Sequence, residues 1–548
     1  LKPHLSFLSA SISVYLRQIF LFFLFFLMLP AFSECYRIKE VSYLLEKTRE
    51  NDLRRVVPID GDKIFESEEE LNEYLDDLRQ RLLNTRSFDE VKILRQKLED
   101  TDSTDYESLN PKSSILNPTL LSLSIECYDT KSFLILPYPK YDSNSGLIFK
   151  VKVKDVNFLG TMNTLNAGAF VGLKEDSENG GQNLTLGAEF SYRYPFYIGS
   201  LYGSWNNNFE LEYTRGGNEL EFWSGTGLTF EKPFKRLSLV FDISEEFNRD
   251  LEYEDFSDTQ YFTTDLNFSV PVKIFDINNW GYVFWTPSLD TKVSYDKDGI
   301  SIKNDDLAGP VISTGQSISS SRINWYGNFR TGLSAKIGHS AGYDFKQEEV
   351  ETKVFGEIQA FKSFKYIGFN TRFSAFVTKS NRSEIGSLIR GVRDEQKYLN
   401  ESGKWLCTKK ALKTPSALVL NIDLPIHIIT THWLDWSDSF FGETSWFSRK
   451  FAWTDKFNFE LQISPFIDIA LTKNEITGRL FSPKDGWYTG GLEFLVFPER
   501  WKGIVIRGSL GLDLGRAIIS KKYPDKIDLT WRENVKKYEV YAGIGLLY

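Results

Sequence analysis

The residue types that most often catalyse reactions or hold metal ions are few in this chain and far apart. The four histidines are His4, His339, His427 and His432, and this scatter does not supply the clustered ligands of a zinc centre. His427 and His432 flank a predicted turn, and neither lies beside a serine and a carboxylate on the inward face of a strand. The sequence contains no phosphate-binding glycine loop, zinc spacing or calcium-binding loop. We therefore expect a protein that is not an enzyme and has no cofactor or metal ion.

The composition disfavours several other classes of protein. The 548 residues include 65 Lys and Arg against 74 Asp and Glu, and the resulting net charge of -9 disfavours a nucleic-acid partner. Three cysteines are too few for a disulfide scaffold, and a mean hydropathy of -0.30 excludes a bundle of membrane-spanning helices. Aromatic residues nevertheless make up 15% of the chain. An aromatic-rich chain that is polar on average is typical of a transmembrane β-barrel.

Segments in which apolar and polar residues alternate recur from residue 147 to the end of the chain. Phe149, Val151 and Val153, for example, alternate with three lysines. A soluble β-sandwich alternates too, with its polar face towards water, whereas in a barrel the polar face lines the lumen and the apolar face meets lipid. The pattern predicts an all-β transmembrane barrel of about 16 antiparallel strands over residues 147–548, with residues 322–338 as one strand.

The last of these segments supports a barrel in an outer membrane. Its two faces are an apolar face of Tyr538, Val540, Ala542, Ile544, Leu546 and Tyr548 and an inward face that includes Glu539, Gly543 and Gly545. The segment ends on an aromatic residue, and this pattern resembles the terminal β-signal of outer-membrane barrels. We expect Phe149, Val151 and Val153 of the first strand to meet Ile544, Leu546 and Tyr548 of the last at the barrel seam.

The beginning of the sequence has the pattern of an export signal. An apolar run from Ile19 to Leu29 follows Arg17 and, at about 11 residues, is too short to span a bilayer. Ala31 and Ser33 then provide the small-x-small pattern of a signal-peptidase site, so residues 1–33 are predicted to be a signal peptide cleaved after Ser33. The alternative, a buried core helix, is disfavoured by the basic flank.

Residues 34–131 predict a small α+β domain, which a linker at residues 132–146 separates from the barrel. A strand at 36–43 precedes a capping box at Ser67 and Glu70, an apolar helix face from Leu71 to Leu82, and strands at 88–94 and 121–127. This order resembles a POTRA domain, and the segment Asn84-Thr85-Arg86-Ser87-Phe88-Asp89-Glu90-Val91 resembles that module's turn into its second strand. The resemblance implies that periplasmic or lipoprotein partners dock on residues 36–131 by strand addition. Cys35 and Cys127 would be either a disulfide or two unpaired small residues.

Three barrel motifs resemble the BamA/TamA superfamily, also called the bacterial surface antigen family. Gly146-Leu147-Ile148-Phe149, with Asp155-Val156-Asn157-Phe158-Leu159-Gly160, resembles the first barrel strand and its turn. Ile389-Arg390-Gly391-Val392 is similar to the signature tip of the sixth outer loop, and Ser464-Pro465-Phe466-Ile467-Asp468 resembles the element facing it on strand 13. The predicted strands put Ile389 between strands 11 and 12, which is the sixth outer loop, and their alternation points Asp468 into the lumen.

These motifs have a common physical logic. A loop folded into the lumen is held best by a charge-assisted pair such as the Arg390 guanidinium with the Asp468 carboxylate, and Gly391 would allow a tight turn at the wall. The alternative for Arg390 is a solvated loop arginine. The sequence departs from the family at Val392, which replaces an aromatic residue, and has one POTRA-like domain. It also has a long aromatic segment at 428–456, whose rings would suit a membrane interface.

The resemblance implies a protein of the bacterial outer membrane, with its N-terminal domain in the periplasm. Its partners would be outer-membrane lipids and unfolded or secreted client polypeptides, which it would assemble, insert or translocate when the seam opens and templates their strands. Two alternatives remain open. The first is a passive porin or surface adhesin, which would need neither the periplasmic domain nor residues 389–392. The second is a dedicated exporter like those of two-partner secretion.

Overall fold

The computed structural model describes most of the chain in two compact units. The described residues are 35–98, 118–142, 146–175, 182–215, 219–250, 259–277, 281–300, 307, 309–379, 383–392, 396–399, 405–408, 413–442, 446–474, 476–534 and 537–546. The smaller unit takes in Arg54–Leu82, Glu90–Cys127 and the residues up to Leu45, and the larger unit contains Glu46–Leu53, Leu83–Asp89 and Tyr128–Tyr548. The predicted cleavage residues Ala31 and Ser33 lie outside the described residues, as does Tyr548.

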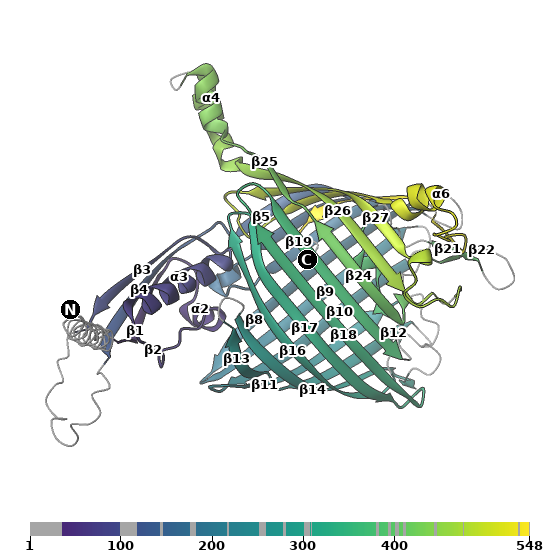
Figure 1. The fold of residues 1–548 in the computed structure, drawn as a ribbon, viewed down its shortest axis with the longest axis horizontal. Coiled ribbons are helices and arrows are strands. Elements are labelled where there is room, and N and C mark those ends of the chain that lie inside the picture. Colours follow the sequence, from purple (N-terminus) through teal and green to yellow (C-terminus); the bar gives the residue numbers. More distant parts are fainter. Residues whose placement is uncertain are drawn as a thin grey trace, which may run out of the picture. The chain divides into compact units, whose positions relative to one another are not determined.

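The smaller unit is built on a four-stranded sheet with two helices (Figure 1). Its elements are β1(Tyr36–Leu45), α2(Glu50–Val56), β2(Ile64–Phe65), α3(Glu68–Asn84), β3(Phe88–Lys97) and β4(Thr119–Asp129), in the sheet order β2-β1-β4-β3. Strands β1 and β4 are parallel. The core between α3 and the sheet contains Ile38, Phe65, Leu71 and Leu123, all nearly inaccessible to solvent, because the apolar face of α3 recurs at helical spacing.

A capping arrangement begins α3. The Glu70 backbone N–H donates to Ser67 Oγ at 3.1 Å, as a capping box requires, but the Glu70 carboxylate accepts from the backbone N–H of Glu66 rather than from that of Ser67. Cys35 and Cys127 are not joined by a disulfide. They lie at opposite ends of a parallel pair, since Cys127 aligns with Leu45 at the end of β1 while Cys35 precedes its start, so the strand pairing itself keeps them apart.

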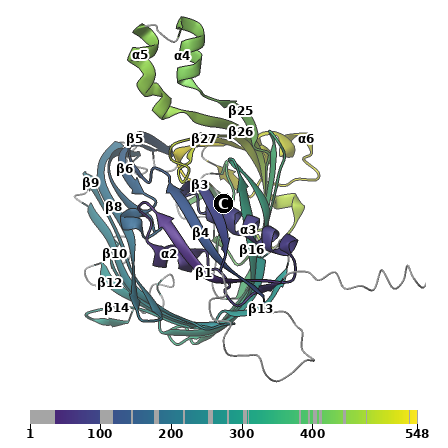
Figure 2. The same ribbon diagram turned by 90° about the vertical axis from the view of Figure 1, so that its left-hand side faces the viewer.

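The larger unit is a barrel-shaped antiparallel sheet, seen from the side in Figure 1 and from one end in Figure 2. Its strands are β5(Phe133–Asp142), β6(Gly146–Asp155), β7(Leu165–Glu175), β8(Gln182–Ile198), β9(Leu201–Arg215), β10(Glu219–Pro233), β11(Ser238–Arg249), β12(Gln260–Ser269), β13(Val272–Ile277), β14(Gly281–Asp296), β15(Gly299–Ile300), β16(Val311–Tyr326), β17(Phe329–Asp344), β18(Glu349–Ser363), β19(Gly368–Lys379), β24(Ser416–Asp423), β25(Ile426–Thr430), β26(Phe459–Thr472), β27(Trp487–Pro498), β28(Ile506–Asp513) and β30(Tyr538–Ile544). Successive full-length strands pair antiparallel with one another, so the sheet is a meander.

Connections of the barrel contain the remaining elements. They are η1(Phe158–Gly160), β20(Ser383–Glu384), η2(Gly386–Leu388), β21(Gln396–Leu399), β22(Trp405–Thr408), β23(Lys413–Thr414), α4(Trp433–Phe441), α5(Trp446–Phe451), η3(Ala452–Phe457), η4(Pro483–Asp485), η5(Gly515–Ile519), α6(Ser520–Lys522) and β29(Arg532–Asn534). We call the end of the barrel at which β5 begins the near end and the opposite end the far end. Connections alternate between the two ends, and this places α4 and α5 at the near end and the β19–β24 connection at the far end.

The strand number differs from the predicted value. Among the barrel strands that the structure describes, β13 continues β12 and pairs with β14, and β25 continues β24 and pairs with β26. Strand β15 has only two residues and forms a short hairpin with the end of β14. Setting these three aside leaves 18 full strands, two more than the 16 predicted. One difference comes from residues 322–338, which are not one strand but straddle the tight β16–β17 hairpin at Gly327 and Asn328. The Ser- and Gly-rich lumen side of β16 resembles a loop in sequence, because small polar residues serve both purposes.

The second difference is β5. Residues 132–146 were expected to be a linker, yet Phe133–Asp142 forms a ladder with β6 over its whole length although it contains Pro137 and Pro139. Proline is disfavoured in central strands because it has no backbone N–H to donate to the neighbouring strand. It is tolerated where its nitrogen points away from the strand that forms the continuous ladder, which for β5 is β6. Strand β6 is therefore an inner strand, and β5 forms the first edge of the sheet.

Side chains along the strands alternate between a polar inner face and an apolar outer face. On β26, Gln462, Ser464 and Asp468 are buried while Ile467 is 52% exposed. Outward residues of the neighbouring strands, such as Leu492, Phe494 and Leu510, are exposed as well. Within the described part of the chain, no helix is long and apolar enough to cross a membrane.

Candidate functional site

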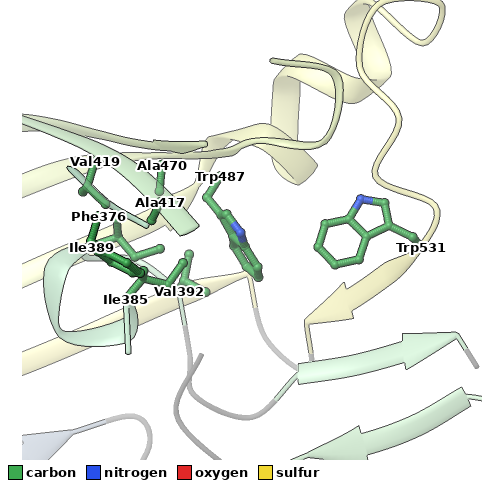
Figure 3. Packing of buried hydrophobic residues seen from close by; sticks show 9 residues of the cluster. All are labelled: Phe376, Ile385, Ile389, Val392, Ala417, Val419, Ala470, Trp487 and Trp531. Carbon is green, nitrogen blue, oxygen red and sulfur yellow. The ribbon is translucent and has the colours of Figure 1, made fainter. Parts of the chain in front are cut away.

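The connection between β19 and β24 contains a short buried segment, residues 385–392. Ile385, Ile389 and Val392 are each no more than 3% exposed. Figure 3 shows them packed against wall residues of four strands, with Trp531 nearby from another far-end connection; the wall residues are Phe376, Ala417, Val419, Ala470 and Trp487. The pairing of β20 with β23 holds the two sides of the connection together at its base. The segment is thus fixed by apolar packing on both sides of its tip.

Arg390 stands at the tip of this segment and is 4% exposed. Its Nε and its backbone N–H both donate to Asp468 Oδ2 at 2.9 Å, and its Nη2 donates to Asp468 Oδ1 at 2.7 Å. This is the two-pronged geometry in which guanidinium and carboxylate interact most strongly. The two residues that the sequence analysis paired therefore lie in direct contact.

Two further carboxylates complete the arrangement. Arg390 Nη1 donates to Asp423 Oδ1 at 2.6 Å and lies 3.1 Å from Glu493 Oε1. We call Arg390, Asp423, Asp468 and Glu493 the anchor cluster. Its carboxylates come from β24, β26 and β27, which are adjacent in the sheet, and all three are at inward positions. Strand register therefore gathers them at one place on the wall.

The electrostatics of the anchor cluster favour a permanently charged arginine. Burial by itself lowers the pKa of Arg390, but the hydrogen bonds that it donates to Asp468 and the negative charges of Asp468, Asp423 and Glu493 outweigh burial and raise that pKa well above its usual value. The guanidinium carbon also lies 3.8 Å from the ring centre of Phe466, and the electron-rich face of that ring attracts the positive charge. Three carboxylates around one cation leave excess negative charge, and Arg507 offsets part of it by binding Glu493 at 2.6 Å.

Gly391 brings the loop backbone against the wall. Its φ is +79°, and a Cβ there would lie 2.8 Å from the Leu512 backbone nitrogen. On the facing strand, a Cβ on Gly511 would lie 2.6 Å from the Gly391 Cα, so the contact needs glycine on both sides. The Gly391 N–H donates to Glu539 Oε2 at 2.6 Å, and Glu539 lies on β30. The buried segment thus contacts the last strand of the barrel directly.

Several residues of the site were not recognised in the sequence. Asp423, Glu493, Arg507 and Gly511 were not singled out. The signal that could have found Asp423 and Glu493 is an acidic residue at an inward position next to the Asp468 strand. That signal depends on strand register, which periodicity does not provide. Within the described residues, no group of three or more His, Cys, Asp or Glu is arranged to hold a metal ion.

The seam of the barrel lies between β5 and β30. Among the described residues, the pair across it joins Tyr541 to Asp142, and β30 and β5 are neighbours in the order of the sheet. The expected seam between β6 and β30 is wrong, because β5 occupies the position beside β30. Phe149 and Val151 are instead outward residues of an inner strand, and Val153 lies half-buried on the same strand.

The other side of the predicted seam also differs. Strand β30 ends at Ile544, and Leu546 does not continue its outward face. Instead the Gly545 N–H donates to the Val505 carbonyl, and Leu546 packs against a buried group of Leu495, Phe497 and Val505. The apolar pattern of the segment is therefore used for two purposes, an outer face up to Ile544 and a buried contact after it.

Comparison with known proteins gives matches of structure only. No protein-family model matches the sequence, and no curated protein matches it. The chain is similar to BamA from Haemophilus ducreyi lacking POTRA domains 1–3, with 11% identity over 93% of this chain and 85% of that chain and a TM-score of 0.40. It is also similar to CdiB from Acinetobacter baumannii (9% identity, 93% and 74% coverage, TM-score 0.45) and to CdiB from Escherichia coli (9%, 93% and 76%, 0.46). At such identities and TM-scores, these similarities assign neither a function nor a residue role to this chain.

Proposed function

We propose that this chain is an outer-membrane barrel of BamA/TamA type that assembles, inserts or translocates other polypeptides. The observation that carries the proposal is the anchor cluster. The superfamily resemblance was drawn on Arg390 and Asp468, which are 78 residues apart in sequence, and the same two residues make three hydrogen bonds in the barrel interior. A passive pore has no need of a buried, charge-anchored loop that occupies its lumen.

The location in a membrane is supported by the outer face of the sheet. Large apolar side chains on neighbouring strands, among them Val354, Phe373 and Ile467, are between 42% and 56% exposed. A water-soluble protein rarely exposes a contiguous apolar surface of this kind, whereas a lipid-facing strand requires it. The near end of the barrel, at which the chain enters β5 after the α+β domain, would then face the periplasm.

Action on polypeptides is supported by the seam. An incompletely paired edge offers free N–H and C=O groups to another strand, and such pairing gives backbone affinity without demanding a fixed sequence. Because Pro137 and Pro139 of β5 have no backbone N–H to donate, β5 has fewer donors to offer to β30 than an ordinary strand. We propose that client strands enter here, and that the POTRA-like domain docks clients or partner proteins by strand addition.

Depletion of the protein in its host, followed by an outer-membrane proteome, tests the function. Broad loss of barrel proteins is expected, and complementation with Arg390→Ala should fail while the exposed-site control Arg193→Ala should succeed. Loss of one secreted protein alone would indicate a dedicated exporter. An unchanged proteome with altered solute uptake would refute the proposal in favour of a porin.

A further inference from the structure

The connection between β25 and β26 has a structure unlike the other near-end turns. Where neighbouring hairpins turn within a few residues, residues 431–458 form α4, α5 and η3, which we call the aromatic hairpin. Figures 1 and 2 both show α4 projecting sideways from the barrel wall, away from the lumen, and Figure 2 shows α5 beside it. The aromatic hairpin therefore points into the space that surrounds the barrel, at the level of its near end.

The aromatic hairpin exposes an unusual amount of aromatic surface. Its most exposed large side chains are Phe440 at 83%, Trp446 at 69%, Phe441 at 57%, Trp453 at 55% and Phe457 at 54%. In α4 the apolar residues gather on one side, since Trp433, Trp436 and Phe440 follow at spacings of three and four, while Asp435 is on the opposite side. Exposing the apolar side of such a helix to water is energetically unfavourable, so this side is expected to be covered.

The apolar surface continues from the aromatic hairpin onto the barrel wall. A register shift after His427 in β25 turns both Ile428 and Ile429 outward, at 49% and 40% exposure. The adjacent β18–β19 turn contributes Phe364 and Tyr366, which are also exposed. These side chains form one continuous apolar surface with the outward side chains of the barrel that the proposed function assigns to lipid. The aromatic hairpin and the barrel wall should therefore contact the same medium.

Polar groups of the aromatic hairpin are placed as at a membrane boundary. Lys450 Nζ lies 4.4 Å from the ring centre of Trp446, so that a cation and an indole share one exposed position at the tip of α5. At a membrane interface, a long basic side chain keeps its charged group at the lipid headgroups, while its aliphatic carbons and a neighbouring aromatic ring lie deeper in the bilayer. Arg449 beside Lys450 adds a second exposed cation.

The base of the aromatic hairpin is well ordered by specific contacts. The Trp433 N–H donates to Asn458 Oδ1 at 3.1 Å, and its indole Nε1 donates to the Phe457 carbonyl at 3.3 Å. Asn458 Nδ2 in turn donates to Asp455 Oδ1 at 2.8 Å. These bonds join the two ends of the insertion next to the wall, so the apolar tip is presented at a defined place rather than on a loose loop.

We propose that the aromatic hairpin inserts its apolar side into the interfacial layer of the bilayer leaflet at the near end of the barrel, with Arg449 and Lys450 at lipid phosphates. The proposal rests on the membrane location given under the proposed function. Lipid is favoured over a protein partner because the exposed surface is continuous with the lipid-facing wall and because its direction is sideways, along a membrane. The hairpin locally replaces lipid headgroups beside the barrel.

Site-specific labelling tests the insertion. The mature full chain, with Cys35, Cys127 and Cys407 replaced, would carry a single cysteine at Phe440→Cys or, as an independent position, Trp446→Cys. The matched control is Asp435→Cys on the opposite side of α4. Each variant is folded into phosphatidylcholine and phosphatidylglycerol vesicles, checked for heat-modifiable migration, and labelled with an environment-sensitive fluorophore.

The expected result is blue-shifted emission at position 440 and at position 446, with quenching by shallow nitroxide lipids about twofold or more stronger than at position 435. Equal quenching of all three positions by aqueous iodide would overturn the proposal. Shielding at 440 that lipid nitroxides do not quench, and that grows with protein density, would overturn it in favour of contact between two copies. A chain that alkaline washing removes from vesicles would refute the membrane location itself, whereas an inserted barrel with a water-exposed label refutes only the hairpin proposal.

Discussion

Two regions of the same barrel differ sharply in how they are held together. Around the anchor cluster, β24, β26, β27 and β28 pair in long registers, and their inward residues are almost completely buried. At the seam, one pair among the described residues, Tyr541 with Asp142, joins β5 to β30. Stability in this barrel is therefore distributed unevenly, and the firmest wall lies only one strand away from the weakest.

The two regions are also connected. Glu493 of the anchor cluster binds Arg507, and the Arg507 guanidinium lies 5.1 Å from the ring centre of Tyr541 on the seam strand. The Gly391 N–H reaches Glu539 on the same strand. Strand β30 thus has its inward side held by the buried loop while its other side forms the seam with β5, so loosening the loop should loosen the seam.

The largest effect is expected from Arg390→Ala. This substitution leaves three buried carboxylates facing one another, so the free energy of unfolding should fall by about 3–5 kcal/mol. Denaturant unfolding of the detergent-folded barrel measures the loss, and cleavage by external trypsin after Arg393 or Lys397 reports release of the loop.

The double mutant sharpens this result. Asp468→Ala leaves Arg390 with two other carboxylates and should cost less than Arg390→Ala. The double mutant should be milder than the sum of the two single mutants, because both remove the same interaction. Arg193→Ala, at an exposed arginine, is the control and should change stability by about 0–1 kcal/mol. Additive losses would mean that Arg390 and Asp468 act independently.

A smaller effect is expected where the two backbones touch. Gly391→Ala and Gly511→Ala each introduce a Cβ within 3 Å of backbone atoms, and each should cost about 1–3 kcal/mol by forcing the loop away from the wall. Gly508→Ala on the same strand is the control, since its nearest neighbouring atom would be 4.0 Å away. Hydrogen exchange of the β30 amides should rise in the first two variants. Unchanged exchange would break the connection between loop and seam.

The seam itself can be strengthened. Replacing Pro137 and Pro139 by threonine restores two N–H donors on the edge of β5, and each new bond to β30 should contribute about 0.5–1.5 kcal/mol. The expected outcome is slower exchange at the seam together with reduced activity on clients. Pro195→Thr, on β8 and paired with Ser204 of β9, is the control for replacing a strand proline away from the seam. Full activity with a strengthened seam would argue against client entry there.

The sequence predicted the elements whose chemistry is local. The alternation of β26 correctly pointed Asp468 inward, and the helical spacing from Leu71 to Leu82 correctly gave the buried face of α3. The far-end position of Arg390 was also obtained correctly, although two strand errors cancelled to give it. Leaving out β5 and merging β16 with β17 each shift the strand parity by one.

What the sequence did not predict depends on register between strands. The local sequence pattern does not distinguish Asp423 or Glu493 from ordinary lumen residues. Only the pairing of β24 and β27 with β26, the strand of Asp468, brings the three carboxylates together. Strand β5 was missed for a different reason. Proline argues against a strand in general, yet this barrel contains prolines in β5 and also in the inner strands β8, β14 and β26, so two prolines did not exclude a strand at 133–142.

The smallest effect is expected on the connection that leads from the firm wall to the seam. In residues 514–537, Asp528 accepts from the Thr530 hydroxyl at 2.7 Å and from the Thr530 N–H, and lies 3.5 Å from Arg479. The hydroxyl bond contributes most to a lowered pKa of Asp528. A lowered folded-state pKa means that the stabilisation is present above about pH 4, the usual range of an aspartate, and is lost as the pH falls through the lowered value. Asp528→Asn should therefore speed hydrogen exchange around Trp531 at pH 7, with a cost of about 0–1 kcal/mol, and this difference should shrink as the pH falls through the lowered pKa. Asp525→Asn in the same connection should match the unmodified chain over the same range of pH. If Asp528→Asn left exchange at pH 7 unchanged, the carboxylate would have no part in positioning the connection between the two regions.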